Sequence, residues 1–309
     1  MKKLLWSFSL LAAFFAVPRS MKNPRSEQVA RCQIGSRFFH VARTWVAAVV
    51  LFASPVCAVT VGAAPEHPIK NIVLVHGAFA DGSSWAKVIT ILQDKGYNVT
   101  AVQTPLTSLA DDVATTRRAL AQQDGPVILV GHSWGGVVIT EAGMDPKVVG
   151  LVYVAAFGPD QGEVVGELGK AYPPPPAFTA PIVDKEGFMR LPTDAVVKHF
   201  ASDLPAREAL VVAATQGPIA VSAFGAQVSG VAWKTKPSWY IVSTLDGAIA
   251  PDEERFFAKR MKATTTELKA SHVSMLSQPK AVAAVIMDAA VKAQGVSDAK
   301  VRRTKCDLI

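Results

Sequence analysis

One stretch near the middle of the chain constrains the fold more than any other, residues 126–135, Pro-Val-Ile-Leu-Val-Gly-His-Ser-Trp-Gly. The apolar run before the first glycine predicts a buried strand, and the apolar residues after the second predict a helix. Between them the Gly-x-Ser-x-Gly pattern predicts a very tight turn that presents Ser133 beyond the carboxyl end of the strand. Glycine is expected at both flanks, because a Cβ at Gly131 or Gly135 would crowd the neighbouring strand and helix.

The chemistry expected at such a turn is nucleophilic. The helix that begins after Ser133 directs its free N–H groups and the positive end of its dipole at the site, where they would stabilise an oxyanion. Glycine-rich turns also join strand to helix in nucleotide-binding folds, so the context must decide between the two interpretations.

The context is a series of short apolar segments that alternate with helical patterns. This alternation predicts an α/β fold with a mostly parallel central sheet flanked by helices on both faces. The predicted strands are residues 72–75, 97–102, 127–130, 148–155, 239–243 and 265–269. The predicted helices are residues 85–95, 108–122, 137–142, 251–261 and 279–293.

The alternation stops over residues 158–236, which divide the predicted core into residues 67–157 and 237–293. Four consecutive prolines at positions 173–176 exclude both a helix and a central strand there, and only short amphipathic pieces follow. We interpret this segment as a helical cap inserted between two core strands and call it the cap. Residues 294–309 are basic without apolar periodicity and are predicted to form a disordered tail.

The first 64 residues have the character of a targeting sequence. The apolar run Trp45–Cys57 follows Arg37 and Arg43 and precedes small residues, which is the order of a secretory signal. We expect a secreted or periplasmic bacterial protein after cleavage near Ala58 or Ala64, without a stable membrane span. A second apolar run, residues 4–17, indicates either an upstream extension over 1–20, with Met21 as the start, or the alternative of a retained N-terminal anchor.

Charge and cysteine content exclude several function classes. Residues 1–64 contain eight Lys or Arg and one acidic residue, so they carry the whole net charge of +7. The remaining residues are neutral overall, which argues against a nucleic-acid partner. Only Cys306 lies after residue 64, so no thiol cluster can bind a metal and no disulfide can form within the mature chain. No metal or other cofactor is expected.

A nucleophilic serine needs a histidine to accept its proton and a carboxylate to orient that histidine. Asp246 and His272 each follow a predicted late strand, and the chain order Ser133, Asp246, His272 is the one expected for a serine presented on a strand-turn-helix. The rival acid is Asp252, which follows Pro251 at a helix start where a carboxylate serves the dipole. The other histidines lie in the presequence, before the first strand, in glycine turns or in the cap.

Two backbone N–H groups are expected to form the oxyanion hole. One belongs to Trp134, directly after the nucleophile, and the other to Ala78 in the His76–Phe79 loop after the first strand. Gly77, Phe79 and Val273 are the predicted substrate contacts.

Residues 71–293 resemble the α/β-hydrolase superfamily, in the branch of small bacterial esterase-like hydrolases related to plant methylesterases and hydroxynitrile lyases. The resemblance rests on Asp246 and on four segments, which are His76–Phe79 with Trp85, Gly131–Gly136, Val152–Phe157 and Ser271–Leu276. It implies a helical cap over the serine and no metal or organic cofactor. Trp134 departs from the tyrosine or methionine that related sequences often have, which puts substrate size in doubt.

Two positions separate the esterases of that branch from its lyases. The lyases carry threonine after the histidine of the first-strand loop and lysine after the catalytic histidine, whereas this chain has Gly77 and Val273. The sequence therefore predicts a serine hydrolase that cleaves small-molecule carboxylic esters through an acyl-enzyme. The alternatives are hydroxynitrile-lyase-like or other non-ester chemistry on the same three residues, and a non-catalytic small-molecule receptor.

Overall fold

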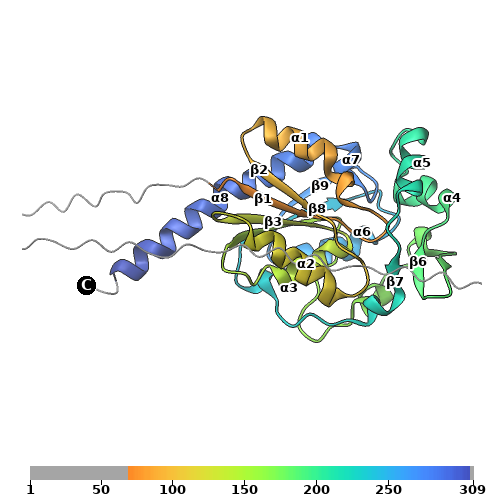
Figure 1. The fold of residues 1–309 in the computed structure, drawn as a ribbon, viewed down its shortest axis with the longest axis horizontal. Coiled ribbons are helices and arrows are strands. Elements are labelled where there is room, and N and C mark those ends of the chain that lie inside the picture. Colours follow the sequence, from red (N-terminus) through yellow and green to blue (C-terminus); the bar gives the residue numbers. More distant parts are fainter. Residues whose placement is uncertain (1–68, 307–309) are drawn as a thin grey trace, which may run out of the picture. The chain divides into compact units, whose positions relative to one another are not determined.

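The computed structural model describes residues 69–306 (Figure 1). The predicted presequence, with its possible extension over residues 1–20, lies outside the described residues. So do residues 307–309 of the predicted tail.

The core is a six-stranded parallel sheet in the order β2-β1-β3-β4-β8-β9. The strands are β1 (Asn71–Val75), β2 (Asn98–Val102), β3 (Val127–His132), β4 (Val148–Val154), β8 (Ser238–Ser243) and β9 (Thr264–Leu268). The central strands β1, β3 and β8 are buried at every residue, as expected when helices cover both faces of a sheet. This confirms the predicted α/β fold.

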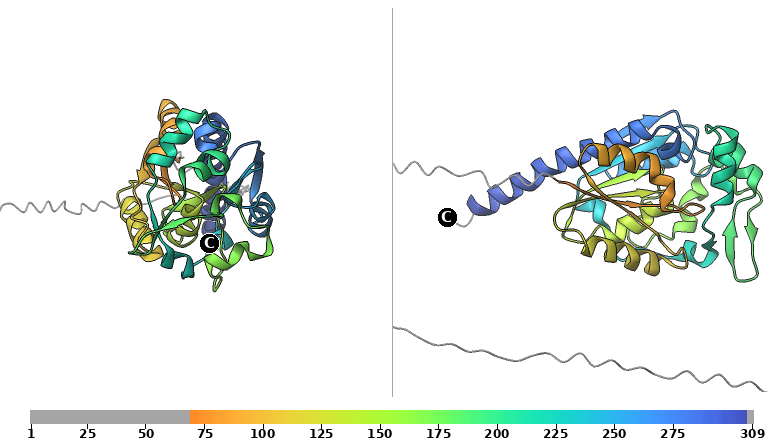
Figure 2. Two further views of the ribbon diagram at one scale, coloured as in Figure 1. Left: turned by 90° about the vertical axis from the view of Figure 1, so that its right-hand side faces the viewer. Right: turned by 45° about the horizontal axis from the view of Figure 1, so that its top comes forward.

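Helices cover the two faces of this sheet (Figures 1 and 2). The helices α1 (Ala86–Asp94) and α8 (Pro279–Cys306) pack together on one face, and α2 (Leu109–Ala121) and α3 (Trp134–Ala142) pack together on the other. A further helix, α6 (Pro251–Arg260), packs on β8. The start of α2 has a structural cause, because the side chain of Ser108 accepts a hydrogen bond from the N–H of Asp111.

The cap lies beyond one end of the sheet and contains helical segments, as predicted, together with a small sheet that the sequence did not indicate (Figure 1). It contains an antiparallel sheet of β5 (Ile182–Val183), β6 (Phe188–Arg190) and β7 (Ile219–Ala220). Strands this short show no alternation that the sequence could reveal. Its helical segments are η2 (Val165–Ala171), η3 (Pro176–Phe178), α4 (Thr193–Ala195), η4 (Val196–Phe200), α5 (Ala206–Ala214), η5 (Val221–Gly225) and η6 (Ala232–Lys234).

The prediction of a disordered tail is wrong for residues 294–306, because α8 continues to Cys306. Residues 296–306 contain no proline and several good helix formers, among them Ala299, Lys300, Arg302 and Arg303. Once the preceding turns pack on the sheet, the helix can propagate into such residues without an apolar stripe of its own.

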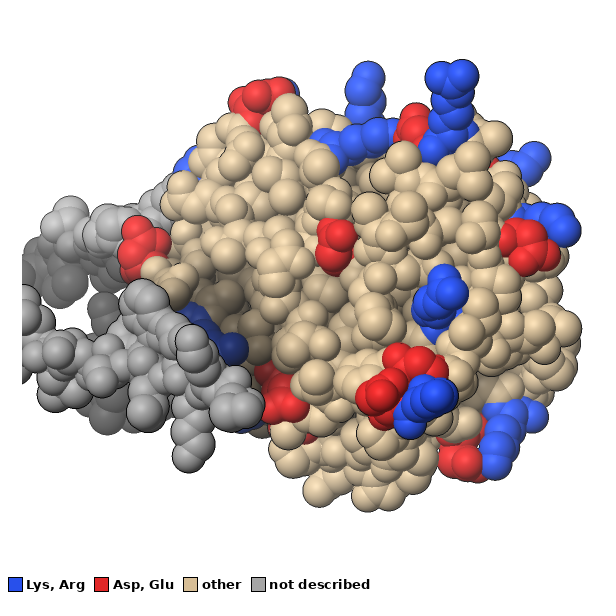
Figure 3. All heavy atoms as spheres, turned by 45° about the vertical axis from the view of Figure 1, so that its right-hand side comes forward, with Lys and Arg blue, Asp and Glu red and all other residues tan. Residues whose placement is uncertain are grey.

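The surface of the described residues carries dispersed charge. On the face drawn in Figure 3, acidic and basic side chains are interspersed over a mostly uncharged surface. Among the described helices, none is both long enough and apolar enough to cross a lipid bilayer.

Candidate active site

The predicted turn between β3 and α3 forms, and Ser133 lies at its apex. Ser133 has a φ of 53° and a ψ of −120°, a strained conformation that L-residues rarely adopt. Three backbone hydrogen bonds hold it. Its N–H donates to the carbonyl of Val154 at 3.2 Å, and its carbonyl accepts from the N–H groups of Gly136 at 2.9 Å and Phe157 at 3.2 Å. The strain is therefore maintained by the adjacent strand β4, and the serine is presented beyond the sheet edge.

The flanking glycines are required by close backbone contacts. A Cβ at Gly131 would lie 2.5 Å from the carbonyl oxygen of Gly135, and one at Gly135 would lie 2.6 Å from that of Val75. At Gly77 a Cβ would lie 2.6 Å from the Cβ of Ser133. Gly77 thus faces the predicted nucleophile directly, and a side chain there would displace it.

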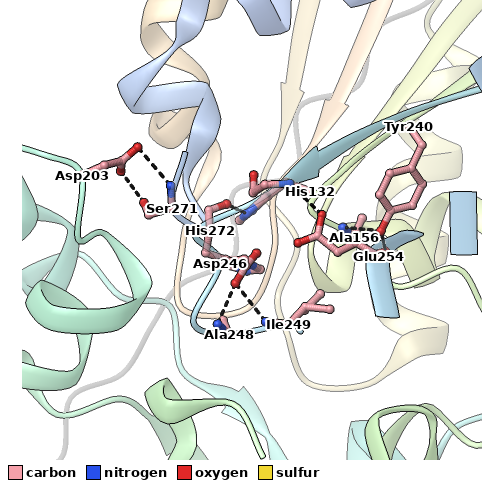
Figure 4. A network of polar contacts seen from close by, with 11 residues as sticks. His132, Ala156, Asp203, Tyr240, Asp246, Ala248, Ile249, Glu254, Ser271 and His272 are labelled. Carbon is pink, nitrogen blue, oxygen red and sulfur yellow. Dashed lines mark hydrogen bonds and ion pairs between the residues drawn. The ribbon is translucent and has the colours of Figure 1, made fainter. Parts of the chain in front are cut away.

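The structure brings Asp246 and His272 together. Asp246 follows β8 and His272 follows β9, and Asp246 Oδ2 accepts a hydrogen bond of 2.5 Å from His272 Nδ1 (Figure 4). The other oxygen of Asp246 accepts hydrogen bonds from the N–H groups of Ala248 (2.6 Å) and Ile249 (2.9 Å). Because Nδ1 carries the donated proton, the lone pair of the imidazole is at Nε2.

No hydrogen bond joins Ser133 to His272 in this structure. His272 Nε2 is buried without a hydrogen-bond partner among the described residues. The ring of His132, next to Ser133 in the chain, has its centroid 4.6 Å from that of His272, and its Nε2 donates to the His272 carbonyl at 3.0 Å. Hydrogen bonds between a nucleophile and its base are commonly long in unliganded enzymes and tighten when substrate binds.

His132 supports the His272 loop as a neutral group. Burial and the nearby His272 lower the pKa of His132 well below its ordinary value, so it does not add a positive charge to the site. His132 thus contacts the backbone of the predicted base.

Two further carboxyls lie behind Asp246, on α6. Burial, with Asp246 as the second cause, raises the pKa of Glu253 to about 7 and that of Glu254 well above its usual range. Glu254 Oε2 accepts a 3.0 Å hydrogen bond from the N–H of Ser243 at the end of β8. Burial and the nearby Asp246 thus favour the neutral form of the Glu254 carboxyl, and Asp246 itself accepts three hydrogen bonds.

The predicted oxyanion donors lie in the loop after β1 and at the start of α3. Trp134 is the first residue of α3, so its N–H has no acceptor within the helix. In the β1 loop the N–H of Phe79 donates to the carbonyl of Gly217 at 3.0 Å, and Ala78 stays the predicted donor there. Phe79 has a φ of 61°, so this loop is strained as well.

Phe79 and Val273 line a cavity of about 200 Å³ between the cap and the core. Its other walls come from the segment around η1 (Gly82–Trp85), from α5 and from α7 (Ser274–Ser277), and they include Leu204, Val211, Val212 and Leu276. The charged residues that line it are Asp81 and Glu208, and Glu208 is paired with Lys87 at 2.7 Å. Gly77, Ser133, Asp246 and His272 do not line this cavity.

The rival acid Asp252 lies elsewhere. Its side chain is 80% exposed in the first turn of α6 and forms an ion pair of 2.8 Å with Arg255. It stabilises the start of α6 through the helix dipole and forms no hydrogen bond or ion pair with His272. Of the rival histidines, His76 binds Thr104 through Nε2 and is buried behind the β1 loop.

The sequence analysis missed three acidic residues that contact the site. Asp112 accepts the indole N–H of Trp134 at 2.8 Å, Glu254 supports the end of β8, and Asp203 of the cap binds Ser271. Asp112 and Glu254 lie on the buried faces of α2 and α6, so an acid at the helical spacing of the apolar residues was an available signal. Asp203 lies in an irregular segment without such a signal.

Metal ligands do not gather in this part of the chain. Within residues 69–306, no group of three or more His, Cys, Asp or Glu side chains is placed to hold a metal ion.

The fold and the turn at Ser133 define a class, which is a three-layer α/β protein with a strained strand-turn-helix at the carboxyl edge of its sheet. The chain belongs to the alpha/beta hydrolase family, whose pattern matches residues 72–285.

Curated relatives match in part of their length. The chain is 32% identical over 156 residues to a carbendazim hydrolyzing esterase of Nocardioides sp., covering 44% of this chain and 64% of that protein. It is 37% identical over 108 residues to methylesterase 7 of Arabidopsis thaliana, covering 29% of this chain and 41% of that protein. The chain thus spans between about two fifths and just under two thirds of these relatives.

Solved structures match over nearly their whole length. Polyneuridine aldehyde esterase superposes with a TM-score of 0.62 at 20% identity, covering 71% of this chain and 98% of that one. A pyrethroid hydrolase of Sphingobium faniae JZ-2 superposes with a TM-score of 0.61 at 23% identity, covering 72% of this chain and 97% of that one. At these identities the likeness concerns the fold.

Proposed function

We propose that the protein is a serine hydrolase that cleaves carboxylic esters of small molecules through an acyl-enzyme. The observation that carries the proposal is the 2.5 Å contact between Asp246 and His272 beside the strained turn of Ser133. Relatives named as an esterase and a methylesterase support ester bonds as the target.

In the proposed reaction Ser133 Oγ attacks the ester carbonyl carbon while His272 Nε2 takes the hydroxyl proton. The N–H groups of Ala78 and Trp134 stabilise the oxyanion, and Asp246 stabilises the imidazolium that forms. The imidazolium then gives the proton to the departing alkoxide, which leaves as the alcohol. Water, deprotonated by His272, attacks the acyl-enzyme; the carboxylic acid leaves and Ser133 recovers its proton.

The lining of the cavity between cap and core favours an apolar, uncharged group in the substrate. Phe79, Val211, Val212 and Val273 form its walls, and the lining offers no free cation to pair with an anionic group. Val273 also occupies the position where the related lyases carry a lysine, which disfavours release of cyanide. Gly77 leaves no space for the threonine of those lyases, because even a Cβ would meet Ser133.

The proposal is tested with p-nitrophenyl acetate and a fluorophosphonate probe. The wild-type protein should turn over the ester and be labelled, whereas Ser133→Ala should do neither while keeping its fold. Ser222→Ala, which removes an exposed serine of the cap, serves as the matched control. Wild-type turnover by Ser133→Ala would exclude the assignment. Activity on cyanohydrins without activity on esters would favour the lyase alternative, and ligand binding without labelling would favour the receptor.

We also propose that the protein is exported, on the basis of the charged, apolar and small-residue order of its first 64 residues. N-terminal sequencing of the exported protein tests this proposal, and a mature chain that begins at Met1 or Met21 would exclude it.

A further inference from the structure

A carboxylate of the cap binds the loop that carries His272. Asp203 Oδ2 accepts a 3.0 Å hydrogen bond from the backbone N–H of Ser271, and Asp203 Oδ1 accepts a second from the Ser271 hydroxyl (Figure 4). Ser271 is fully buried and directly precedes His272. A side chain from the cap therefore fixes the backbone of the residue next to the predicted base, 68 positions away in sequence.

The same cap segment contacts the His272 ring. The ring of Phe200 has its centroid 4.7 Å from that of His272 and is inclined to it by 58°. Phe200 ends η4, a π-helical turn, and the N–H of the next residue, Ala201, returns to the carbonyl of Val196 at 2.8 Å. A π-turn often marks a functional site, and this one brings Phe200 and Asp203 to the same loop.

The η4 turn also contacts the loop of the predicted acid. A Cβ at Gly247, the residue after Asp246, would lie 2.6 Å from the carbonyl oxygen of His199. The cap segment 199–203 thus packs against both loops that supply the acid and the base. From the core, Asp246 binds His272 at Nδ1, and His132 contacts its carbonyl and its ring.

We propose that Asp203 is a positioning residue that sets the place of His272 by holding Ser271 through two hydrogen bonds. This inference rests on the proposed function, because His272 is the base in that reaction. Its consequence is that the base is correctly placed only while the cap is seated on the core. The cap is then part of the reaction machinery as well as a wall of the cavity between cap and core.

The direct test is the kinetics of Asp203→Ala with p-nitrophenyl acetate. A displacement of a reacting group by about 1 Å can reduce a rate on the order of 100-fold, so kcat should fall about 10- to 100-fold with KM close to the wild-type value. Asp203→Asn keeps one acceptor oxygen and should lose less. Asp194→Ala, which removes an exposed cap carboxylate paired only with Lys198, is the matched control and should keep wild-type kinetics.

Two double variants distinguish a positioning role of Asp203 from a general structural role. If Asp203 acts through Ser271, the double variant Asp203→Ala with Ser271→Ala should be no slower than Asp203→Ala alone. If it acts on the base, Asp203→Ala should cause no further loss in a His272→Ala background. A kcat for Asp203→Ala equal to the wild-type value, or an equal loss in the presence and absence of His272, would overturn the inference.

A measurement that does not depend on turnover distinguishes failure of the proposed hydrolase function from failure of the role proposed for Asp203. Hydrogen exchange of the segment 270–276 should be faster in Asp203→Ala and unchanged in Asp194→Ala. If the wild-type protein hydrolyses no ester, the proposed function fails, and this exchange decides alone whether Asp203 holds the loop. Unchanged exchange in Asp203→Ala would overturn the inference under either result.

Discussion

The indole Nε1 of Trp134 donates a 2.8 Å hydrogen bond to Asp112 Oδ2, which ties the residue after the predicted nucleophile to helix α2. The second oxygen of Asp112 accepts the N–H of Leu106 at 2.8 Å, and Leu106 has a φ of 58°. One fully buried carboxyl thus satisfies two buried donors and holds a strained residue. The indole of Trp134 is directed at α2 by this contact.

Asp112→Ala should destabilise the protein by about 2–4 kcal/mol, because it leaves two buried N–H groups without acceptors. Denaturant unfolding followed by circular dichroism measures the loss. Asp111→Ala, at the adjacent exposed carboxyl that accepts from Ser108, is the control and should cost about 1 kcal/mol or less. Equal midpoints for the two variants would contradict the role given to Asp112.

The contribution of Glu253 and Asp112 to stability should decrease as the pH rises from about 4 to about 7. Burial raises the pKa of Glu253 to about 7 and that of Asp112 to about 6, so the folded protein binds these protons more tightly than the unfolded chain does. Between the unfolded and folded pKa values the folded state carries more protons, and its stabilisation is lost with rising pH.

Glu253→Gln isolates the contribution of one of these carboxyls. The variant should be more stable than the wild type by about 1–3 kcal/mol at pH 8 and equal to it at pH 4, where Glu253 is protonated in both states. Urea unfolding at both pH values is the measurement, with Glu186→Gln, at an exposed position, as the control. A gain of the same size at both pH values would refute the assignment to Glu253.

Asp246→Asn should reduce kcat by about 1,000- to 10,000-fold while the fold is kept. An asparagine oxygen can still accept from Ala248 and Ile249, but its amide would face Nδ1 of His272 and favour the wrong tautomer. Steady-state kinetics and the rate of fluorophosphonate labelling should decrease together. A loss of less than about tenfold would mean that another carboxylate serves His272.

Gly247→Ala should disturb the contact between the cap and the acid loop. The new Cβ would lie 2.6 Å from the His199 carbonyl, and relief of such an overlap commonly costs about 1–3 kcal/mol. We expect a lower melting temperature and a lower kcat. Gly225→Ala is the control within the cap, because no atom lies within 4 Å of the added Cβ. Unchanged kcat in Gly247→Ala would show that η4 can shift without effect on the site.

The sequence was sufficient to predict the sheet, its helices and the meeting of Asp246 with His272. Glycine and proline bound the apolar runs, and the carboxyl ends of parallel strands converge at one edge, so residues there meet whatever their separation. Ser108 and Pro251 even located the starts of α2 and α6.

The cap and its contacts could not be predicted in the same way. The strands β5, β6 and β7 have two or three residues each. The position of Asp203 depends on a π-helical turn that no residue spacing in the sequence predicts. Helix α8 extends beyond its predicted end, which was placed where the apolar periodicity stops. A helix that is already packed on the sheet can continue without such periodicity.

The place where the cap leaves and rejoins the sheet has a consequence for how such proteins diverge. The chain departs after β4 and returns in β8, the neighbouring strand, with Leu151 paired to Ser238. The segment between β4 and β8 can change in length without shifting the register of the sheet. The cap can therefore be exchanged between related proteins while the residues at the sheet edge are kept. A transplanted cap would still have to bring one acceptor for Ser271.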